Sequence, residues 1–322
     1  MPPFPRTLAH GLSTALSTAL TLVASQSLAD VPEVLVDTPP LHSIVASVME
    51  GVGTPILLLP PGSSPHSYAL RPSDAMAIAR AELILWIGPA LTPWLTAPLE
   101  TLGAEARQVS LLDSDGWERL TLRDDPAFFT NDGHDHDHAH DHDHGDDDVA
   151  DTDPHAWLDP LVAAAWAGSI AQTLGDMDPE NAESYASNAS QFTAQMAQLI
   201  ATTTADLAPL SGLSFVVPHD AFQYFEVRFD LPALGAITLS DASSAGPAHL
   251  AALRDQVQST GVRCILTDAQ TSPEWANLLV DGTEARIVMV DSEGTHLEPG
   301  AALYPALIEG LAKALTECLN EE

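Results

Sequence analysis

Basic residues are scarce in this chain, which has 11 lysines and arginines against 45 aspartates and glutamates. The formal net charge of -34 at pH 7 opposes binding to a phosphate backbone or to an anionic membrane surface. We therefore expect no nucleic-acid partner, no stable membrane insertion, and an attraction for cations. An acidic surface also favours solubility, so the charge alone leaves both explanations open.

Long apolar runs are missing after the first thirty residues, so no later segment is expected to cross a bilayer. The one such run, Gly11 to Val23, follows Arg6 and precedes the small residues Ser27-Leu28-Ala29. This arrangement is typical of a secretory signal peptide. We predict that residues 1–29 are removed near Ala29 and that the mature chain is a soluble periplasmic monomer.

Cysteine is almost absent, with two residues, Cys264 and Cys318. An even pair in an exported protein is more often bridged than free. A metal site built on cysteine would need further cysteines. We predict a disulfide that ties the last helix to a core strand and stabilises the fold by about 4 kcal/mol.

Eight short apolar runs alternate with helical patterns. They are Val34–Asp37, Ile56–Leu59, Leu83–Ile87, Val109–Leu112, Phe215–Pro218, Ala236–Leu239, Val262–Thr267 and Ile287–Val290. Their continuous apolar character indicates parallel strands buried on both faces. We predict an α/β fold of two lobes, 30–177 and 209–322, each a four-stranded, mostly parallel sheet flanked by helices.

The most helical stretch separates the two groups of strands. It opens with Asp178-Pro179, a capping residue and a proline at the first helical position, and carries an apolar stripe from Ala182 to Leu207. We predict one long rigid helix over 178–208 that joins the lobes. Two shorter helices within one lobe are the alternative.

Three of the thirteen histidines stand in distinctive settings, because His66, His155 and His219 each follow a predicted strand. Asp268 follows the strand that ends at Thr267. Ligands of open α/β sheets bind at the carboxyl ends of strands, so these side chains can meet in a cleft between the lobes. Three imidazoles and one carboxylate are a typical tetrahedral set for Zn²⁺, whereas Mn²⁺ prefers more oxygen ligands. His42, His249 and His296 are expected to be structural or surface residues.

Residues 131–152 are rich in histidine and aspartate and have almost no apolar content. We predict a disordered loop inserted in the first lobe. Its histidines offer weak, exchangeable metal sites, because ordering the loop costs about 1 to 2 kcal/mol per residue. A solvated spacer is the alternative to an auxiliary collector or sensor. The six histidines are His134, His136, His138, His140, His142 and His144.

Four longer motifs resemble the zinc-specific branch of the metal-binding receptors of ABC transporters, the ZnuA family. They are Pro-Gly…His-Ser-Tyr-Ala-Leu-Arg-Pro-Ser-Asp, Leu-Ile-Leu-Trp-Ile-Gly-Pro, Asp-Pro-His-Ala-Trp-Leu-Asp-Pro and Pro-His-Asp-Ala-Phe-Gln-Tyr-Phe-Glu. The resemblance covers essentially the whole mature chain. It implies two four-stranded lobes joined by a long helix, with the metal between them on His66, His155 and His219, and a bridge between Cys264 and Cys318.

The resemblance leaves the fourth metal ligand open. Some family members have a glutamate before the first histidine, where this chain has Pro65. We therefore predict Asp268, or a water held near it. Related manganese receptors carry a carboxylate where His219 stands, which favours zinc here.

The implied function is capture of Zn²⁺ and its delivery to the inner-membrane permease of a zinc ABC importer, without catalysis. Alternatives are a receptor of this fold for manganese or another divalent metal, a zinc hydrolase, and a periplasmic zinc buffer centred on the His-rich loop. The sequence disfavours a hydrolase, because it has neither a His-Glu-x-x-His helix nor a Gly-x-Ser-x-Gly elbow.

Overall fold

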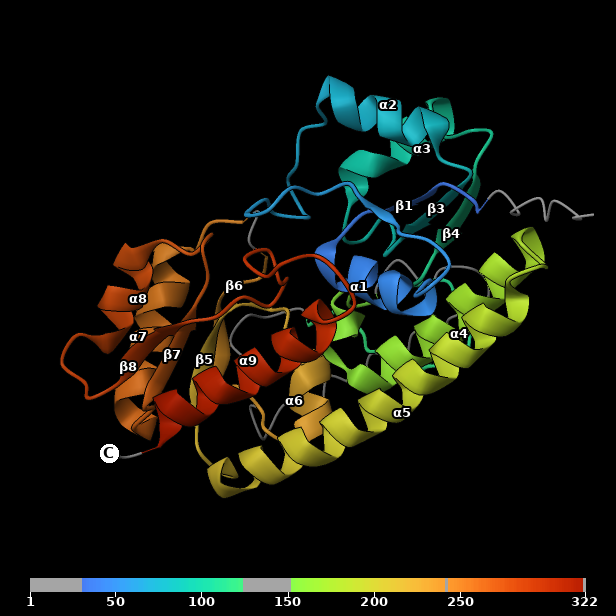
Figure 1. Ribbon diagram of the computed structural model, residues 1–322. Helices are drawn as coiled ribbons and strands as arrows, with labels where there is room; N and C mark the ends of the chain where they lie inside the picture. The colour runs from blue at the N-terminus through green and yellow to red at the C-terminus, as the bar shows by residue number, and fades with distance from the viewer. Residues whose placement is uncertain (1–30, 124–151, 241–242, 321–322) are drawn as a thin grey trace, which may run out of the picture. The chain divides into compact units, whose positions relative to one another are not determined.

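The computed structural model describes residues 31–123, 152–240 and 243–320, which belong to one compact unit (Figure 1). The predicted signal peptide and almost all of the predicted His-rich loop, with its six histidines, lie outside these residues. Among the helices of the described ranges, none is both long and apolar enough to span a membrane.

The first lobe is built on a parallel sheet with the strand order β2-β1-β3-β4. Its strands are β1 (Val34–Val36), β2 (Ile56–Leu57), β3 (Leu83–Trp86) and β4 (Arg107–Ser110). Its helices are α1 (Pro39–Val48), α2 (Pro72–Arg80), α3 (Thr96–Thr101) and α4 (Pro160–Met177). Successive residues of the central strands alternate between two buried clusters: Val34 and Leu83 face one cluster, and Leu35 and Ile84 face the other. The sheet is therefore covered on both faces, as the continuous apolar runs predict.

The second lobe repeats this arrangement with the order β6-β5-β7-β8, again all parallel. Its strands are β5 (Phe215–His219), β6 (Gly235–Thr238), β7 (Cys264–Thr267) and β8 (Arg286–Met289). Its helices are α6 (Gln223–Phe229), α7 (Pro247–Thr260), α8 (Pro273–Val280) and α9 (Leu303–Leu319). The predicted disulfide is confirmed: Cys264 on β7 is bonded to Cys318 on α9, with their Cα atoms 5.4 Å apart.

The long helix α5 (Ala182–Leu207) has 26 residues and begins four positions after the expected Asp178. Asp178 instead ends α4, and its carboxylate accepts hydrogen bonds from Asn181 Nδ2 (2.7 Å) and the Tyr185 hydroxyl (2.9 Å). The Asp-Pro pair thus lies in the turn between α4 and α5, and Asn181 is the N-cap residue of α5.

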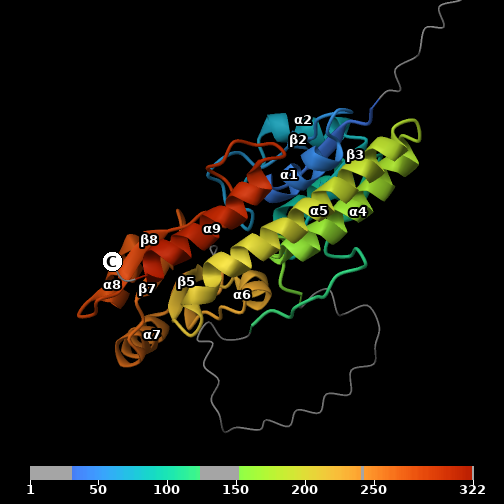
Figure 2. The same cartoon turned by 60° about the horizontal axis from the view of Figure 1, so that its bottom comes forward.

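The apolar stripe of α5 is buried as the spacing predicts. Its buried residues are Tyr185, Ala189, Phe192, Met196, Leu199, Thr203 and Leu207. The helix lies along α4 and also contacts α1, α6 and α9, so one helix packs against both lobes (Figures 1 and 2). The alternative of two shorter helices in one lobe is therefore wrong.

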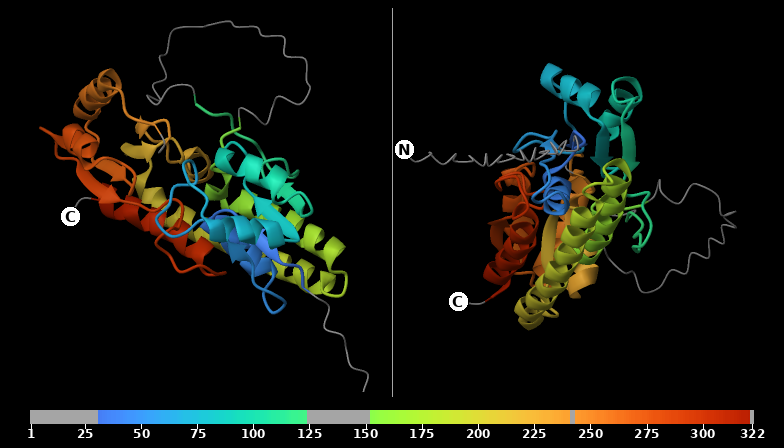
Figure 3. Two further views of the ribbon diagram at one scale, coloured as in Figure 1. Left: turned by 90° about the horizontal axis from the view of Figure 1, so that it is seen from above. Right: turned by 45° about the vertical axis from the view of Figure 1, so that its right-hand side comes forward.

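Buried hydrogen bonds also connect the lobes close to His155. The indole of Trp157, two residues after His155, donates to the carbonyl of Ser292 at 2.9 Å. The hydroxyl of Tyr304 on α9 donates to the carbonyl of Trp157, and its backbone N–H donates to Ser43 Oγ on α1 at 2.9 Å. In Figure 3 the red helix α9 begins beside the blue helix α1 and runs to the second sheet, so its first turn lies close to these partners.

Candidate metal centre

His66 lies in the loop that follows β2. Its backbone N–H donates to Ser64 Oγ at 3.1 Å, and the preceding carbonyl of Pro65 accepts from the indole of Trp94 at 2.6 Å. These two contacts anchor a loop that has no regular secondary structure, so Ser64 and Trp94 hold the backbone at His66 in place. Its side chain is half-buried.

His155 is positioned by the residues directly before it. Thr152 forms an antiparallel bridge with Thr121, and Asp153 N donates to the carbonyl of Leu120 at 2.8 Å. The carboxylate of Asp153 then accepts from the backbone N–H of His155 (3.0 Å) and lies 2.8 Å from its ring Nδ1. This leaves Nε2 of the buried imidazole as the nitrogen that faces outward from the segment.

His219 is the last residue of β5 and is paired with Thr238 on β6. Its Nδ1 lies 3.1 Å from Oδ2 of Asp268, the residue that follows β7. The other oxygen of Asp268 accepts from the backbone N–H (2.7 Å) and the hydroxyl (2.6 Å) of Thr271, so the carboxylate is fixed from both sides. His219 and Asp268 are both buried.

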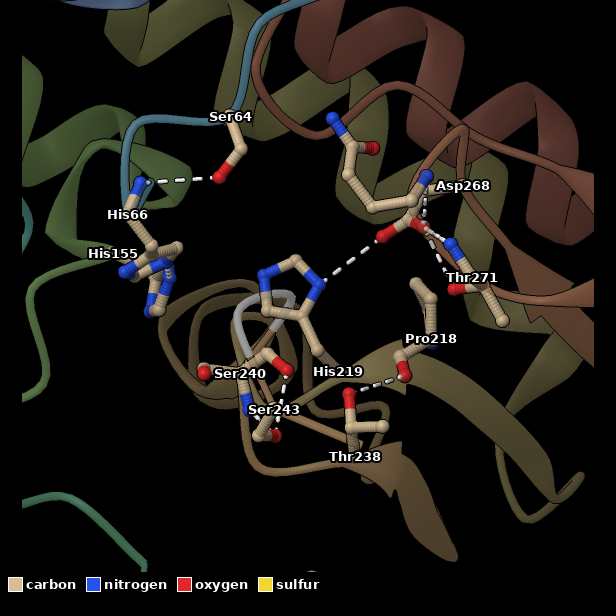
Figure 4. A network of polar contacts seen from close by, with 11 residues as sticks. Ser64, His66, His155, Pro218, His219, Thr238, Ser240, Ser243, Asp268 and Thr271 are labelled. Carbon is tan, nitrogen blue, oxygen red and sulfur yellow. Dashed lines mark hydrogen bonds and ion pairs between the residues drawn. The ribbon is translucent and has the colours of Figure 1, made fainter. Parts of the chain in front are cut away.

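The three histidines converge, and their candidate ligand atoms lie within 4.8 Å of one another (Figure 4). The Nε2 atoms of His66 and His155 are 3.2 Å apart. The Nε2 atom of His219 is buried and has no hydrogen-bond partner among the residues that the structure describes. Among the described residues, this is the one group of three or more His, Cys, Asp or Glu side chains that could hold a metal ion.

The environment of His155 keeps its imidazole neutral. Burial, followed by the charge of His219, holds the pKa of His155 well below its ordinary value of 6.5. A neutral imidazole has the lone pair that a metal ion needs. At neutral pH this residue therefore needs no deprotonation before it can act as a ligand.

The two carboxylates that contact histidines of the metal centre have pKa values shifted in opposite directions. Burial raises the pKa of Asp153 to about 7, against the effect of the hydrogen bond from the His155 backbone. Burial also acts to raise the pKa of Asp268, but the hydrogen bond and charge of His219 and the hydrogen bonds from Thr271 bring it below its usual value. A cation held by His155 would favour the ionised form of Asp153, so cation binding and loss of that proton support each other.

The predicted fourth residue, Asp268, lies behind His219 rather than among the three converging nitrogens. The other described histidines lie elsewhere: His42 Nε2 is 3.1 Å from the carbonyl of Pro55, and His249 Nε2 is 2.8 Å from that of Ala236. His296 is largely exposed beside Asp291. Asp153 is a supporting residue that the sequence patterns do not single out, although it stands two residues before His155 in the Asp-Pro-His motif.

The chain matches a known protein family over most of its length. The profile of the family described as "Zinc-uptake complex component A periplasmic" matches residues 34–318. The chain is similar to the high-affinity zinc uptake system protein ZnuA of Brucella suis biovar 1, with 40% identity over 309 residues, 89% of this chain and 92% of the relative. The protein of the same name from Paracoccus denitrificans is 38% identical over 96% of this chain and 98% of its own length.

Solved structures share the fold at low sequence identity. A ZnuA crystal structure has a TM-score of 0.73 and 19% identity, covering 90% of this chain and all of the other. A Mn²⁺ complex of FpvC from Pseudomonas aeruginosa has a TM-score of 0.72 and 16% identity, covering 89% of this chain and 98% of the other. The shared fold therefore occurs in a protein titled as a manganese complex as well as in ZnuA, and the fold alone does not select the metal.

Proposed function

Because the chain belongs to the zinc-uptake complex component A family, we propose that it captures Zn²⁺ in the periplasm and delivers it to the permease of an ABC importer. The proposed ligands are Nε2 of His66, His155 and His219. The ion is the cargo, so the protein needs to bind and release it without transforming a substrate.

The observation that carries this proposal is the convergence of three imidazole nitrogens. One of them, His219 Nε2, is buried and has no hydrogen-bond partner within the described part of the chain. A buried polar atom without a partner costs free energy, and a metal bond would remove that cost. Zinc bonds of about 2.0–2.1 Å in a tetrahedral site separate the ligand atoms by about 3.3 Å. The 3.2 Å between the Nε2 atoms of His66 and His155 fits this separation.

For the fourth position we propose a water molecule in this arrangement of the side chains. Both oxygens of Asp268 are engaged, one with His219 and the other with Thr271. Direct coordination by Asp268, the alternative, would require its carboxylate to leave Nδ1 of His219. In either case three of the four proposed metal ligands are nitrogen atoms, which favours zinc over manganese.

The residues around the three histidines support catalysis less well than reversible metal binding. A zinc hydrolase needs a general base beside the metal-bound water. The two carboxylates that contact imidazole rings of the centre, Asp153 and Asp268, are already engaged in those hydrogen bonds. We therefore propose reversible binding and no catalysis.

We also propose that the histidines between residues 134 and 144 act as an auxiliary zinc collector. Deletion of residues 132–148 is expected to remove weak binding and to leave one tightly bound zinc per chain. Zinc titration against a chelator measures both classes. Near-complete loss of tight binding in the deletion variant would instead support the zinc-buffer function.

The central test is competition between zinc and manganese for the metal-free protein and for its His219→Ala variant. Tight zinc binding is expected in the wild type, with manganese unable to compete at equal concentration, and this binding is expected to be lost in the variant. His249→Ala is a matched control, because His249 contacts a backbone carbonyl away from the centre. Tight binding of one zinc by His219→Ala, or equal competition by manganese, would contradict the proposal.

A further inference from the structure

Three buried carboxylates gather beside the metal centre. Asp153 stands two residues before His155, Asp220 directly follows His219, and Glu226 lies on α6. Their exposed fractions are 1%, 3% and 6%. Asp153 belongs to the first lobe and the other two to the second. Their mutual repulsion in a buried setting opposes the approach of the segments that carry His155 and His219.

Arg123 supplies positive charge to this group. Its guanidinium donates to both oxygens of Glu226, at 2.9 and 3.3 Å, and its Nε lies 3.3 Å from Oδ1 of Asp220. Its charge also acts on Asp153. The side chain of Arg123 is 18% exposed, so solvent screens these contacts only in part.

The backbone around Arg123 belongs to the first lobe and is tied to the segment of His155. Thr121 is bridged to Thr152, and the carbonyl of Leu120 accepts from Asp153 N. Asp220 and Glu226, which the guanidinium of Arg123 contacts, lie on the second lobe, next to His219 and on α6. One guanidinium therefore spans from the His155 segment to the His219 segment.

We propose that Arg123 is a positioning residue for the metal centre, holding the segments of His155 and His219 at the spacing that three-nitrogen coordination needs. The inference rests on the proposed zinc function. Arg123 contacts Asp220 and Glu226, and it acts on the metal centre through them. The bidentate geometry matters, because an arginine fork fixes two oxygens at once and a lysine ammonium does not.

The positive charge of Arg123 and its positioning contacts are expected to have opposite effects on zinc affinity. A substitution at Arg123 therefore distinguishes the two roles. A positive charge near a divalent cation repels it, so loss of Arg123 would tighten zinc binding if charge alone mattered. Loss of the positioning contacts would weaken binding. Outer contacts of metal-ligating histidines typically change affinity by about 10- to 100-fold.

The experiment measures zinc affinity and dissociation rate for the wild type, Arg123→Gln and Arg123→Lys by chelator competition and stopped flow. We expect Arg123→Gln to bind zinc at least about 10-fold more weakly, mainly through faster dissociation, and Arg123→Lys to recover part of that loss. Thermal unfolding of each metal-free variant checks that it is folded. Unchanged or tighter zinc binding by folded Arg123→Gln would overturn the inference, whatever the affinity of Arg123→Lys.

Arg228→Gln is the matched control. Arg228 on α6 makes a bidentate pair with Asp159, with both distances at 2.7 Å. Among the described residues, no hydrogen bond or ion pair joins Arg228 to Asp153, Asp220 or Glu226. Its loss is expected to change zinc affinity by less than about 3-fold. An equal loss of affinity in Arg228→Gln would show a general effect of coupling between lobes and overturn the specific role of Arg123. Absence of tight zinc binding in the wild type would instead contradict the proposed function itself.

Discussion

The carboxylate of Asp268 lies 3.1 Å from Nδ1 of His219, on the side of the ring opposite to the nitrogen that faces the other histidines. His155 has the same relationship with Asp153 at 2.8 Å. In each pair the carboxylate and the histidine come from the same lobe. Each lobe therefore orients its own imidazole, and the approach of the lobes brings together rings whose orientation is already set.

Removal of the Asp268 charge is the first test of this arrangement. Asp268→Asn weakens the contact that orients His219 and lowers the basicity of the ring. We expect zinc affinity to fall by about 10- to 100-fold while one zinc per chain still binds. Chelator competition gives the affinity. Asp291→Asn is the control, because Asp291 pairs with the exposed His296 and should leave zinc affinity unchanged.

The depressed pKa of His155 predicts how the metal-free protein responds to acid. In the unfolded chain the imidazole has an ordinary pKa near 6.5, whereas in the folded protein burial and the charge of His219 place it well below that value. Below pH 6.5 the unfolded chain takes up a proton that folded His155 does not, so folding stability falls as the pH decreases from 6.5.

An NMR titration of the histidine rings can follow this behaviour. The His155 ring signal is expected to keep the neutral form as the pH falls below 6.5. Protonation of the His155 ring near pH 6.5 would contradict the prediction.

Asp37 predicts a pH effect of the opposite sign. It follows β1 and is fully buried, with Oδ2 accepting from Ile87 N at 2.9 Å. Burial raises its pKa from 3.8 to about 7, against the hydrogen bond from Ile87. The folded protein therefore keeps a proton that the unfolded chain has lost. The contribution of this proton to folding stability is fully present below pH 3.8. It decreases by about 1.4 kcal/mol per pH unit as the pH rises toward 7.

Asp37→Asn should remove that pH dependence. From pH 5 to pH 7, the free energy of unfolding of the variant should gain about 2 to 3 kcal/mol on that of the wild type. Denaturant unfolding at both pH values measures the change. Parallel pH curves for the two proteins would show that Asp37 does not titrate in this range.

The disulfide between Cys264 and Cys318 spans 54 positions of sequence. A double Cys264→Ser and Cys318→Ser variant is expected to lose about 4 kcal/mol of unfolding free energy, because a crosslink of this length restricts the unfolded chain. Zinc affinity should change by only a few-fold, since α9 still packs against β7. Reductant should destabilise the wild type and leave the double variant unaffected; equal stability of the two proteins without reductant would contradict this account.

The sheets could be predicted from sequence because their strands are short apolar runs buried on both faces. The strand limits could not be fixed to the residue: β4 begins at Arg107, two positions before the predicted Val109, because backbone pairing with β3 continues past the apolar residues. The start of the long helix was misplaced for a related reason. Asp178 can cap a helix, but its carboxylate is used by Asn181 and Tyr185 in a turn.

The three histidines could be predicted because each follows a strand or a recognisable motif, whereas their supporting contacts could not. The partner of His219 lies 49 residues away, and the partner of Arg123 on α6 lies 103 residues away. Such pairs depend on how the lobes pack, which local patterns do not record. Asp268 was predicted as a ligand or as the residue holding a water, and its position behind His219 makes the second possibility the one we propose.

The division of the histidines between the lobes has a kinetic consequence. His66 and His155 come from the first lobe and His219 from the second. On the proposed assignment, separation of the lobes would withdraw His219 in a single step and leave the ion on two histidine nitrogens. A membrane partner that separates the lobes would thus unload a tightly held ion by mechanical work, without offering a stronger chelator of its own.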